Sequence, residues 1–202
     1  MSDFAGFSVD PDLVLRRGQI EADREAFGAS PEPPPTVDPE AFKAAMRVLA
    51  AGVVMVTARQ GGELYGLTVS ACMSITVSPP QVLISLAQTA SCLPAILETR
   101  RFGLSILRAE QKELAELGAI PGGPKRVQAF SETPDGRVAT LAGALAHLEC
   151  SVAQEFRASD HVLIIGNVEH AFTAEGELDE PGPLLYFDRT FYSLGDPVEE
   201  GS

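Results

Sequence analysis

The sequence predicts a mainly β fold, a closed, Greek-key-like antiparallel barrel with a few peripheral helices. Three observations predict it. Runs rich in β-branched and other apolar residues indicate about seven strands. Helical segments do not alternate regularly with these runs, as they would in a doubly wound sheet. Consecutive strands are mostly antiparallel neighbours, because short turns such as Ser159-Asp160 join them.

Composition and charge narrow the possible functions. The 202 residues are enough for one domain with a sizeable core, and 45% of them are hydrophobic. The net charge of −13 argues against nucleic acid or an anionic membrane as a partner, since phosphates require a basic face. Three widely spaced cysteines without a C-x-x-C pair predict neither a disulfide framework nor a zinc site. No apolar run approaches a membrane span, and we expect a cytoplasmic protein.

Three regions are expected along the chain. Residues 1–36 form an N-terminal extension, either a disordered tail or a helical arm that packs on the body or on a second subunit. Residues 37–195 form the domain, and residues 196–202 form an acidic tail. Asp38 and Pro39 are typical of a helix start, so we expect a core-packed helix over 39–50. The remaining elements are strands at 53–58, 64–77, 82–87, 102–107, 144–156, 161–172 and 184–187, helices at 93–99 and 109–117, and a helical turn at 125–130.

The run from Gly66 to Pro80 is the most unusual stretch. Its apolar residues alternate with Thr68, Ser70, Cys72 and other small polar side chains, a period of two that indicates an extended segment. A face of short hydrogen-bonding groups allows a flat polar ligand to approach the backbone closely. The run alone fits a Ser/Thr-rich edge strand equally well.

Several familiar sites are absent from the sequence. It has no G-x-G-x-x-G after a strand, no P-loop and no G-x-S-x-G elbow. Its three histidines (His147, His161 and His170) have no cysteine or carboxylate at metal-ligand spacing. What remains is a binding face without a strong acid–base set, which is typical of a protein whose cofactor carries the chemistry. Thr89 and Ser91 follow a strand and precede a helix, where their hydroxyls suit either helix capping or a phosphate.

Residues 39–195 resemble the flavin reductase-like family, short-chain NAD(P)H:flavin oxidoreductases with an FMN-binding split β-barrel. Members often serve as reductase components of two-component flavin monooxygenases. The resemblance rests on the order and spacing of several short segments rather than on any one motif. These segments are residues 42–57, 66–71, 78–86, 102–107, 148–150, 160–161, 165–168 and 183–186.

The resemblance implies a set of site residues. The isoalloxazine ring of FMN or FAD would lie against Gly66, Leu67, Thr68, Val69, Ser70 and Ala71. The ribityl chain and phosphate would follow Ser85, Ala87, Gln88 and Ser91, and Arg126 and Phe130 lie in a segment that contributes to the flavin or its adenosine. NADH or NADPH would meet His161, Arg189 and Tyr192. Gln88 stands where a basic residue is frequent, which leaves FMN and FAD as alternatives.

The expected function is therefore an NAD(P)H-dependent flavin reductase that passes a hydride from nicotinamide C4 to flavin N5. The resemblance also implies a homodimer with flavin at the subunit boundary, and a partner monooxygenase that receives reduced flavin. Two alternatives stay open: a flavin-binding electron carrier or store without NAD(P)H turnover, and a split-barrel protein for another flat cofactor such as haem or deazaflavin. His161, at the start of an apolar strand, is either structural or a hydrogen-bonding group for the nicotinamide.

Overall fold

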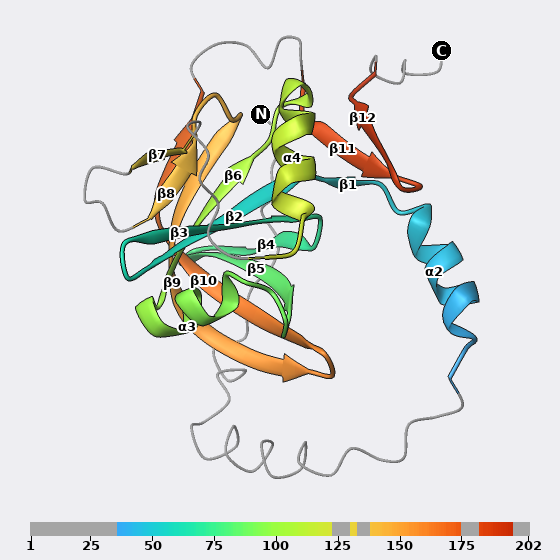
Figure 1. Ribbon diagram of the computed structural model, residues 1–202, viewed down its shortest axis with the longest axis horizontal. Coiled ribbons are helices and arrows are strands. Elements are labelled where there is room, and N and C mark those ends of the chain that lie inside the picture. The colour runs from blue at the N-terminus through green and yellow to red at the C-terminus, as the bar shows by residue number, and fades with distance from the viewer. Residues whose placement is uncertain (1–35, 123–129, 133–137, 175–181, 196–202) are drawn as a thin grey trace, which may run out of the picture. The chain divides into compact units, whose positions relative to one another are not determined.

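The computed structural model describes residues 36–122, 130–132, 138–174 and 182–195 (Figure 1). Contacts within the chain divide it into two units, residues 1–43 and 44–202. Every strand described lies in the second unit. Among the described residues, no helix is both long and apolar enough to cross a membrane.

Seven antiparallel strands form the main sheet, in the order β3-β2-β6-β9-β10-β5-β4. They are β2 (Val54–Gln60), β3 (Glu63–Val69), β4 (Cys72–Val77), β5 (Pro80–Ala87), β6 (Arg101–Ile106), β9 (Ala146–Ala158) and β10 (His161–Thr173). A second sheet joins β1 (Ala51–Gly52), β11 (Leu184–Phe187) and β12 (Thr190–Ser193), and β7 (Phe130–Glu132) pairs with β8 (Ala139–Leu141). The predicted mainly β class is confirmed.

The two end strands of the main sheet, β3 and β4, are consecutive in the chain and only Ser70 and Ala71 separate them. Three Cα–Cα steps span at most about 11 Å. In a flat sheet, strands six places apart would lie about 29 Å from each other. The sheet must therefore curl until its ends meet at this turn. Among the described strands, β3 and β4 do not pair, so the predicted closed barrel is not found.

The single strand expected over 64–77 is wrong, because the chain breaks at Ser70-Ala71 into β3 and β4. Apolar and polar residues keep alternating across the break, so the period of two hides it. Small side chains at the turn let the backbone change direction without a glycine or proline to mark it.

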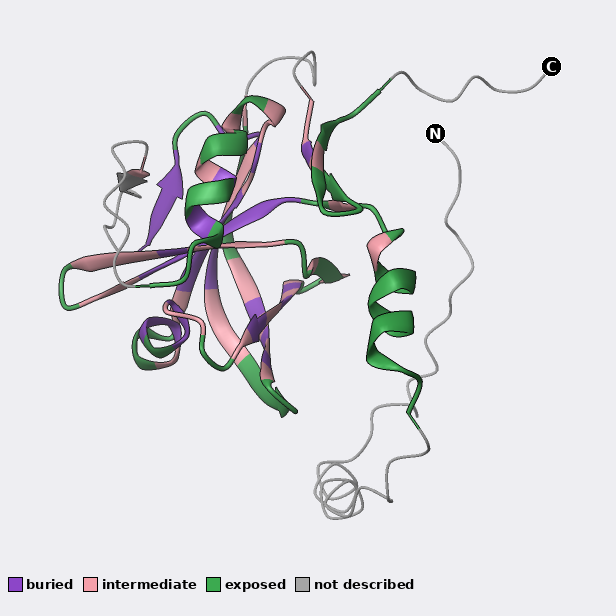
Figure 2. Ribbon diagram, turned by 45° about the vertical axis from the view of Figure 1, so that its right-hand side comes forward, coloured by how far each residue is buried: buried purple, intermediate pink, exposed green. Residues whose placement is uncertain are grey.

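Strand β2 is buried on both faces, as predicted, and separates two apolar clusters. Val54, Val56 and Ala58 belong to the larger cluster, which contains buried residues of helix α3 (Leu93–Thr99). Val53 and Met55 belong to the smaller cluster with Ala115 of helix α4 (Lys112–Ala119). Figure 2 shows buried residues along the central strands and on β8, whereas the tip of the β9–β10 hairpin is exposed.

Helix α2 (Pro39–Arg47) begins as predicted, since the Ala41 amide donates to Asp38 Oδ2 at 3.0 Å. The predicted extent and burial are wrong: the helix ends at Arg47, and Met46 and Leu49 are exposed rather than in the core. Helical spacing reveals an apolar face but does not say which surface covers it.

The other predicted elements differ mainly at their ends. The predicted helix 109–117 starts as a 3₁₀ turn, η2 (Ala109–Gln111), and continues as α4. The β9–β10 hairpin turns at Ser159-Asp160 as expected, with Ser159 at φ 55°. Phe130 lies in β7 rather than in a helical turn, and the rest of that predicted turn lies outside the described residues. So do residues 1–35 and the tail 196–202.

Candidate functional site

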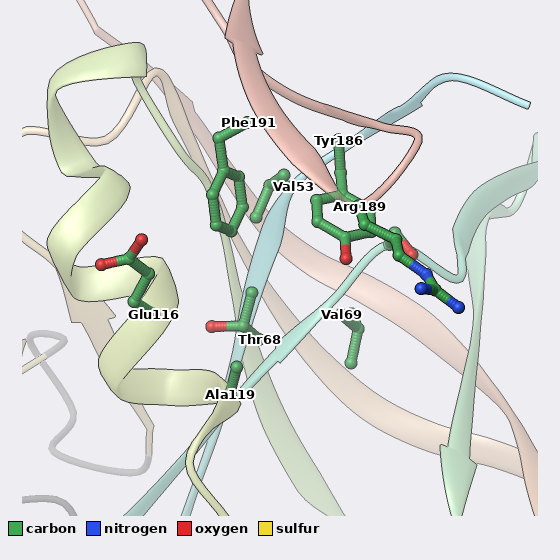
Figure 3. A pocket seen from close by; sticks show the side chains of 9 residues that line it. Val53, Thr68, Val69, Glu116, Ala119, Tyr186, Arg189 and Phe191 are labelled. Carbon is green, nitrogen blue, oxygen red and sulfur yellow. The ribbon is translucent and has the colours of Figure 1, made fainter. Parts of the chain in front are cut away.

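A pocket of about 340 Å³ lies between β3, α4 and the β11–β12 hairpin (Figure 3). Short polar groups of β3, an aromatic pair and two charged side chains surround it. Its lining consists of Val53, Thr68, Val69, Ser70, Glu116, Ala119, Tyr186, Arg189 and Phe191. Pockets of this size hold a single ring system with its substituents.

A second hollow of about 220 Å³ meets the first at the β3–β4 turn, because Ser70 lines both. Its other lining residues are Ala71, Cys72, Met73, Leu83 and Ser85. The Ser85 amide donates to the Ala71 carbonyl at 3.1 Å, which ties the turn to β5. The two hollows therefore adjoin at the point where the sheet ends meet, and together they are called the groove.

Helix α4 is held close to β3 at one wall of the first pocket. The Thr68 hydroxyl donates to the Ala115 carbonyl at 2.8 Å. A Cβ on Gly118 would lie 2.6 Å from the Met55 Cε and would also collide with the Thr68 hydroxyl. Glycine is therefore required for this approach. Thr68 lines the pocket, but its hydroxyl proton is committed to α4.

The opposite wall is the β11–β12 hairpin, whose two turn residues have positive φ. Asp188 has φ 43° and Arg189 has φ 64°, the pattern of a type I′ turn. Each such non-glycine residue costs about 1 kcal/mol in backbone strain. The rings of Tyr186 and Phe191 pair across the hairpin with centroids 5.2 Å apart. The turn carries Arg189 to the rim of the pocket beside this aromatic pair (Figure 3).

His161 lies outside both hollows, where β10 begins. It pairs with Ala87, and Leu163 pairs with Ser85, so Ser85, Ala87 and His161 share one face of the sheet. Asp160 Oδ1 lies 2.8 Å from His161 Nδ1, and this hydrogen bond with the charge of the imidazolium lowers the pKa of Asp160. With Nδ1 donating to Asp160, a neutral His161 presents Nε2 as an acceptor.

Gln88, at the end of β5, holds the β9–β10 turn in place through two hydrogen bonds. Its backbone amide donates to the Asp160 carbonyl at 2.8 Å, and its side-chain amide donates to the Ser159 carbonyl at 2.7 Å. The β9–β10 turn is thereby held against the end of β5. The side chain of Gln88 keeps its oxygen and its second amide N–H for a ligand.

The comparisons with known proteins decide the family. Residues 46–195 match the model of the flavin reductase like domain, which is more than half of the chain. The chain belongs to the flavin reductase-like family. Relatives include the reductase component of 4-hydroxyphenylacetate 3-monooxygenase from Thermus thermophilus, 39% identical over 77% of this chain and 96% of that protein. A flavin reductase (NADH) from Kitasatospora aureofaciens is 34% identical over 83% of this chain and 86% of that protein.

A solved structure agrees with the sequence relatives. The native state of flavin reductase PheA2 superimposes with a TM-score of 0.69 at 32% identity, and the match covers 79% of this chain and 100% of that one. The likeness therefore spans the described β domain rather than a single motif.

The structure brings some predicted residues of this flavin reductase-like domain together and separates others. Thr68, Val69, Ser70 and Arg189 line the first pocket, and Ser70, Ala71 and Ser85 line the second. Leu67 packs against the larger apolar cluster, and Gly66 is buried opposite Thr57. Ser91 is half-buried before α3, whose N-cap residue Cys92 makes no side-chain capping bond. Arg126 lies outside the described residues, and Phe130 packs against the smaller cluster.

The C-terminal aromatic residues differ from expectation. Tyr192 points to the other face of β12, where its ring meets Phe187 at 6.0 Å, and it does not line the pocket. Its neighbour Phe191 does, together with Tyr186. Strand alternation around the hairpin decides which of two adjacent aromatics faces the site.

Glu116 was also missed as a site residue, because the helix 109–117 has the charge pattern of a solvated surface. Among the described residues, no group of three or more His, Cys, Asp or Glu side chains is placed to hold a metal. Cys92 and Cys150 are buried thiols whose pKa values burial raises to about 12, which makes them unreactive.

Proposed function

We propose that this protein is an NAD(P)H-dependent flavin reductase that acts on FMN or FAD. The observation that carries the proposal is the groove in which two hollows meet at Ser70, in a chain of the flavin reductase-like family. The relatives named as NADH-dependent flavin reductases support it.

The backbone edge of β3 beside the groove can form hydrogen bonds with a flavin. Strand β3 ends the described sheet, so it has a strand partner on one side only and presents its other backbone edge to a ligand. We assign the ring to the edge from Gly66 to Ala71, with Ser70 at the centre. We assign the ribityl chain and phosphate to Ser85, Ala87, Gln88 and Ser91, where the serine hydroxyls and the second amide N–H of Gln88 can donate.

A bound flavin supplies a ring that accepts a hydride from nicotinamide at N5. The protein's part is to hold the two rings in contact and to exclude water. Tyr186 and Phe191 form an apolar wall for this purpose, and Arg189 offers a cation to the phosphates of an anionic nucleotide. Hydride transfer requires no general base, which agrees with a pocket whose lining has no histidine or cysteine.

We propose that His161 orients the nicotinamide amide group. Because Nδ1 is engaged with Asp160, the neutral ring accepts the amide N–H at Nε2, and the imidazolium form would instead donate to the amide oxygen. Arg189 stays in the proposed nucleotide site at the pocket, and Tyr192 stays a proposed nucleotide contact on the other face of β12, outside this pocket.

We propose a homodimer with flavin at the subunit boundary. An apolar strip crosses four strands on the outer face of the sheet, where paired residues share one side. The strip consists of Met73, Leu83, Phe156, Leu163 and Ile165. Met73 and Leu83 also line the second hollow, so a partner that covers the strip would cover the groove.

The curled sheet whose ends meet at Ser70-Ala71 supports the split-barrel form of this fold.

We also propose a partner monooxygenase that receives reduced flavin, because two relatives are named as reductase components of monooxygenases.

The three cysteines are free, which supports a reducing, cytoplasmic location.

Steady-state oxidation of NADH and NADPH with FMN, FAD and riboflavin tests the proposal. We expect turnover with at least one flavin, with ping-pong kinetics if flavin stays bound and sequential kinetics if it is a substrate. Flavin binding without nucleotide oxidation would indicate an electron carrier or store. A haem or deazaflavin absorption spectrum in the purified protein would overturn the flavin assignment.

A further inference from the structure

Two charged side chains lie at opposite margins of the first pocket. Glu116 lies on α4 at one margin of the pocket and Arg189 on the β11–β12 turn at the opposite margin, and their charged ends point outward to the rim rather than toward each other (Figure 3). The proposed function uses the cation for nucleotide phosphates, but it gives no role to the carboxylate. A carboxylate repels an anionic ligand, so its position in a nucleotide site calls for a specific role.

Glu116 is held firmly at the backbone. The residue before it, Ala115, accepts the Thr68 hydroxyl, and Gly118 two residues later packs directly on β3. The carboxylate is therefore carried on a segment fixed at both ends to the strand that forms the floor of the pocket.

The charge of Glu116 is only weakly compensated. Lys112 Nζ lies 3.6 Å from its Oε1, and the two side chains are 57% and 54% exposed. A helical pair at this spacing and exposure contributes little and is easily replaced by another partner. The carboxylate is thus available to a ligand at the rim.

We propose that Glu116 selects NADH over NADPH. This inference rests on the proposed function and adds the residue that discriminates between the two nucleotides. They differ only in a 2′-phosphate on the adenosine ribose. With the pyrophosphate at Arg189, the carboxylate accepts a hydrogen bond from the 2′-hydroxyl of NADH and repels the 2′-phosphate of NADPH.

Simple electrostatics sets the size of the effect. A carboxylate and a doubly charged phosphate about 6 Å apart in a solvent-like dielectric repel each other enough to change affinity about tenfold. Because both groups are partly exposed, the effect should shrink as salt is raised.

The test compares Glu116→Gln with Glu113→Gln. Glu113 lies one turn earlier on α4, is exposed and does not line the pocket, so both variants lose the same charge from the same helix. We expect Glu116→Gln to lower the ratio of kcat/KM for NADH to that for NADPH about tenfold, mainly through KM for NADPH. The ratio in Glu113→Gln should match that of the wild type.

Binding of ADP-ribose and of its 2′-phosphorylated form, measured by calorimetry, provides a readout that needs no hydride transfer. Glu116→Gln should gain affinity for the phosphorylated form alone. An unchanged preference in both measurements would overturn the proposal, as would a changed FMN affinity with the preference unaltered, which would place Glu116 against the flavin. Wild-type protein that binds both nucleotides but reduces no flavin would overturn the proposed function and leave the selectivity test standing.

Discussion

At the scale of single residues, Ser70 is the position where a substitution should affect ligand binding most, because it lines both hollows of the groove. We predict that Ser70→Trp fills the point where they meet and weakens FMN binding at least about a hundredfold, since the indole occupies the volume of a flavin ring. Quenching of flavin fluorescence measures the affinity. Far-UV circular dichroism should be unchanged, because Ser70 is exposed outside any strand.

Thr173→Trp serves as the matched control for Ser70→Trp. Thr173 is exposed at the end of β10 and lines neither hollow. It should bind FMN like the wild type. Full FMN affinity in Ser70→Trp would show that the flavin does not use the β3–β4 turn.

His147 links residue chemistry to the pH dependence of stability. Ser105 Oγ lies 3.2 Å from His147 Nδ1 and accepts the Leu141 amide at 2.9 Å, so its own proton is free to go to a neutral imidazole. Burial lowers the pKa of His147 below its ordinary 6.5. Stability from this group is therefore complete above about pH 6.5, the unfolded value, and is lost as pH falls through the folded pKa.

Denaturant unfolding between pH 8 and pH 5 checks this sign. The wild type should lose stability toward pH 5. His147→Gln should lose about 1 kcal/mol at pH 8, the value of one hydrogen bond, and should show a flatter pH profile. An equally steep profile in the variant would assign the pH dependence to other groups.

At the scale of elements, the docking of α4 on β3 couples the stability of the domain to the shape of the site. We predict that Gly118→Ala destabilises the protein by about 1–3 kcal/mol, because the added Cβ collides with Thr68 and Met55. Helix propensity alone predicts the reverse, a gain of about 1 kcal/mol. Thermal and denaturant unfolding decide between them.

Flavin binding provides a second measurement on the same variant. If α4 moves away from β3, Thr68 and Glu116 shift at the pocket wall, and FMN affinity should fall with stability. Glu113→Ala, on the exposed side of α4, controls for propensity and should leave both quantities near wild type. A more stable Gly118→Ala would show that the helix adapts without cost.

The sequence predicted individual strands and helices better than it predicted how they are arranged in the sheet. The buried strand β2, the helix α3 and the β9–β10 hairpin were predictable, because continuous apolar runs and turn residues are local signals. The break at Ser70-Ala71 was not, since alternation runs through it, and neither was the placement of the consecutive strands β3 and β4 at opposite ends of the sheet. That arrangement depends on the curl of the whole sheet.

The candidate site shows the same division. Thr68 to Ser85 were predicted from family motifs that are continuous in sequence. Tyr186, Phe191 and Glu116 come from a hairpin and a helix whose orientation is a tertiary property, so no local signal in the sequence placed them at the pocket. Tyr192 was expected at the pocket, but Phe191 lines it instead. The two residues are adjacent in a strand and therefore present opposite faces.

At the scale of the whole molecule, the apolar strip on the outer sheet face is the feature that a single chain leaves unexplained. Met73 at its edge is 58% exposed, and Phe156 is also exposed. Exposed apolar surface that extends over neighbouring strands is typical of an interface rather than of a soluble monomer's surface. The second hollow lies on the same face, so assembly and flavin binding should depend on each other.

We predict that Met73→Lys converts the proposed dimer to a folded monomer and weakens FMN binding at least about tenfold, because like charges from the two copies would meet at a desolvated interface. Analytical ultracentrifugation measures the mass, and circular dichroism measures the fold. Leu117→Lys, at an exposed apolar position of α4 outside the strip, should stay dimeric. A wild type that sediments as a monomer with full flavin affinity would separate the groove from any partner. In that case the strip must be covered by another protein, and reduced flavin would leave from a site that one subunit completes alone.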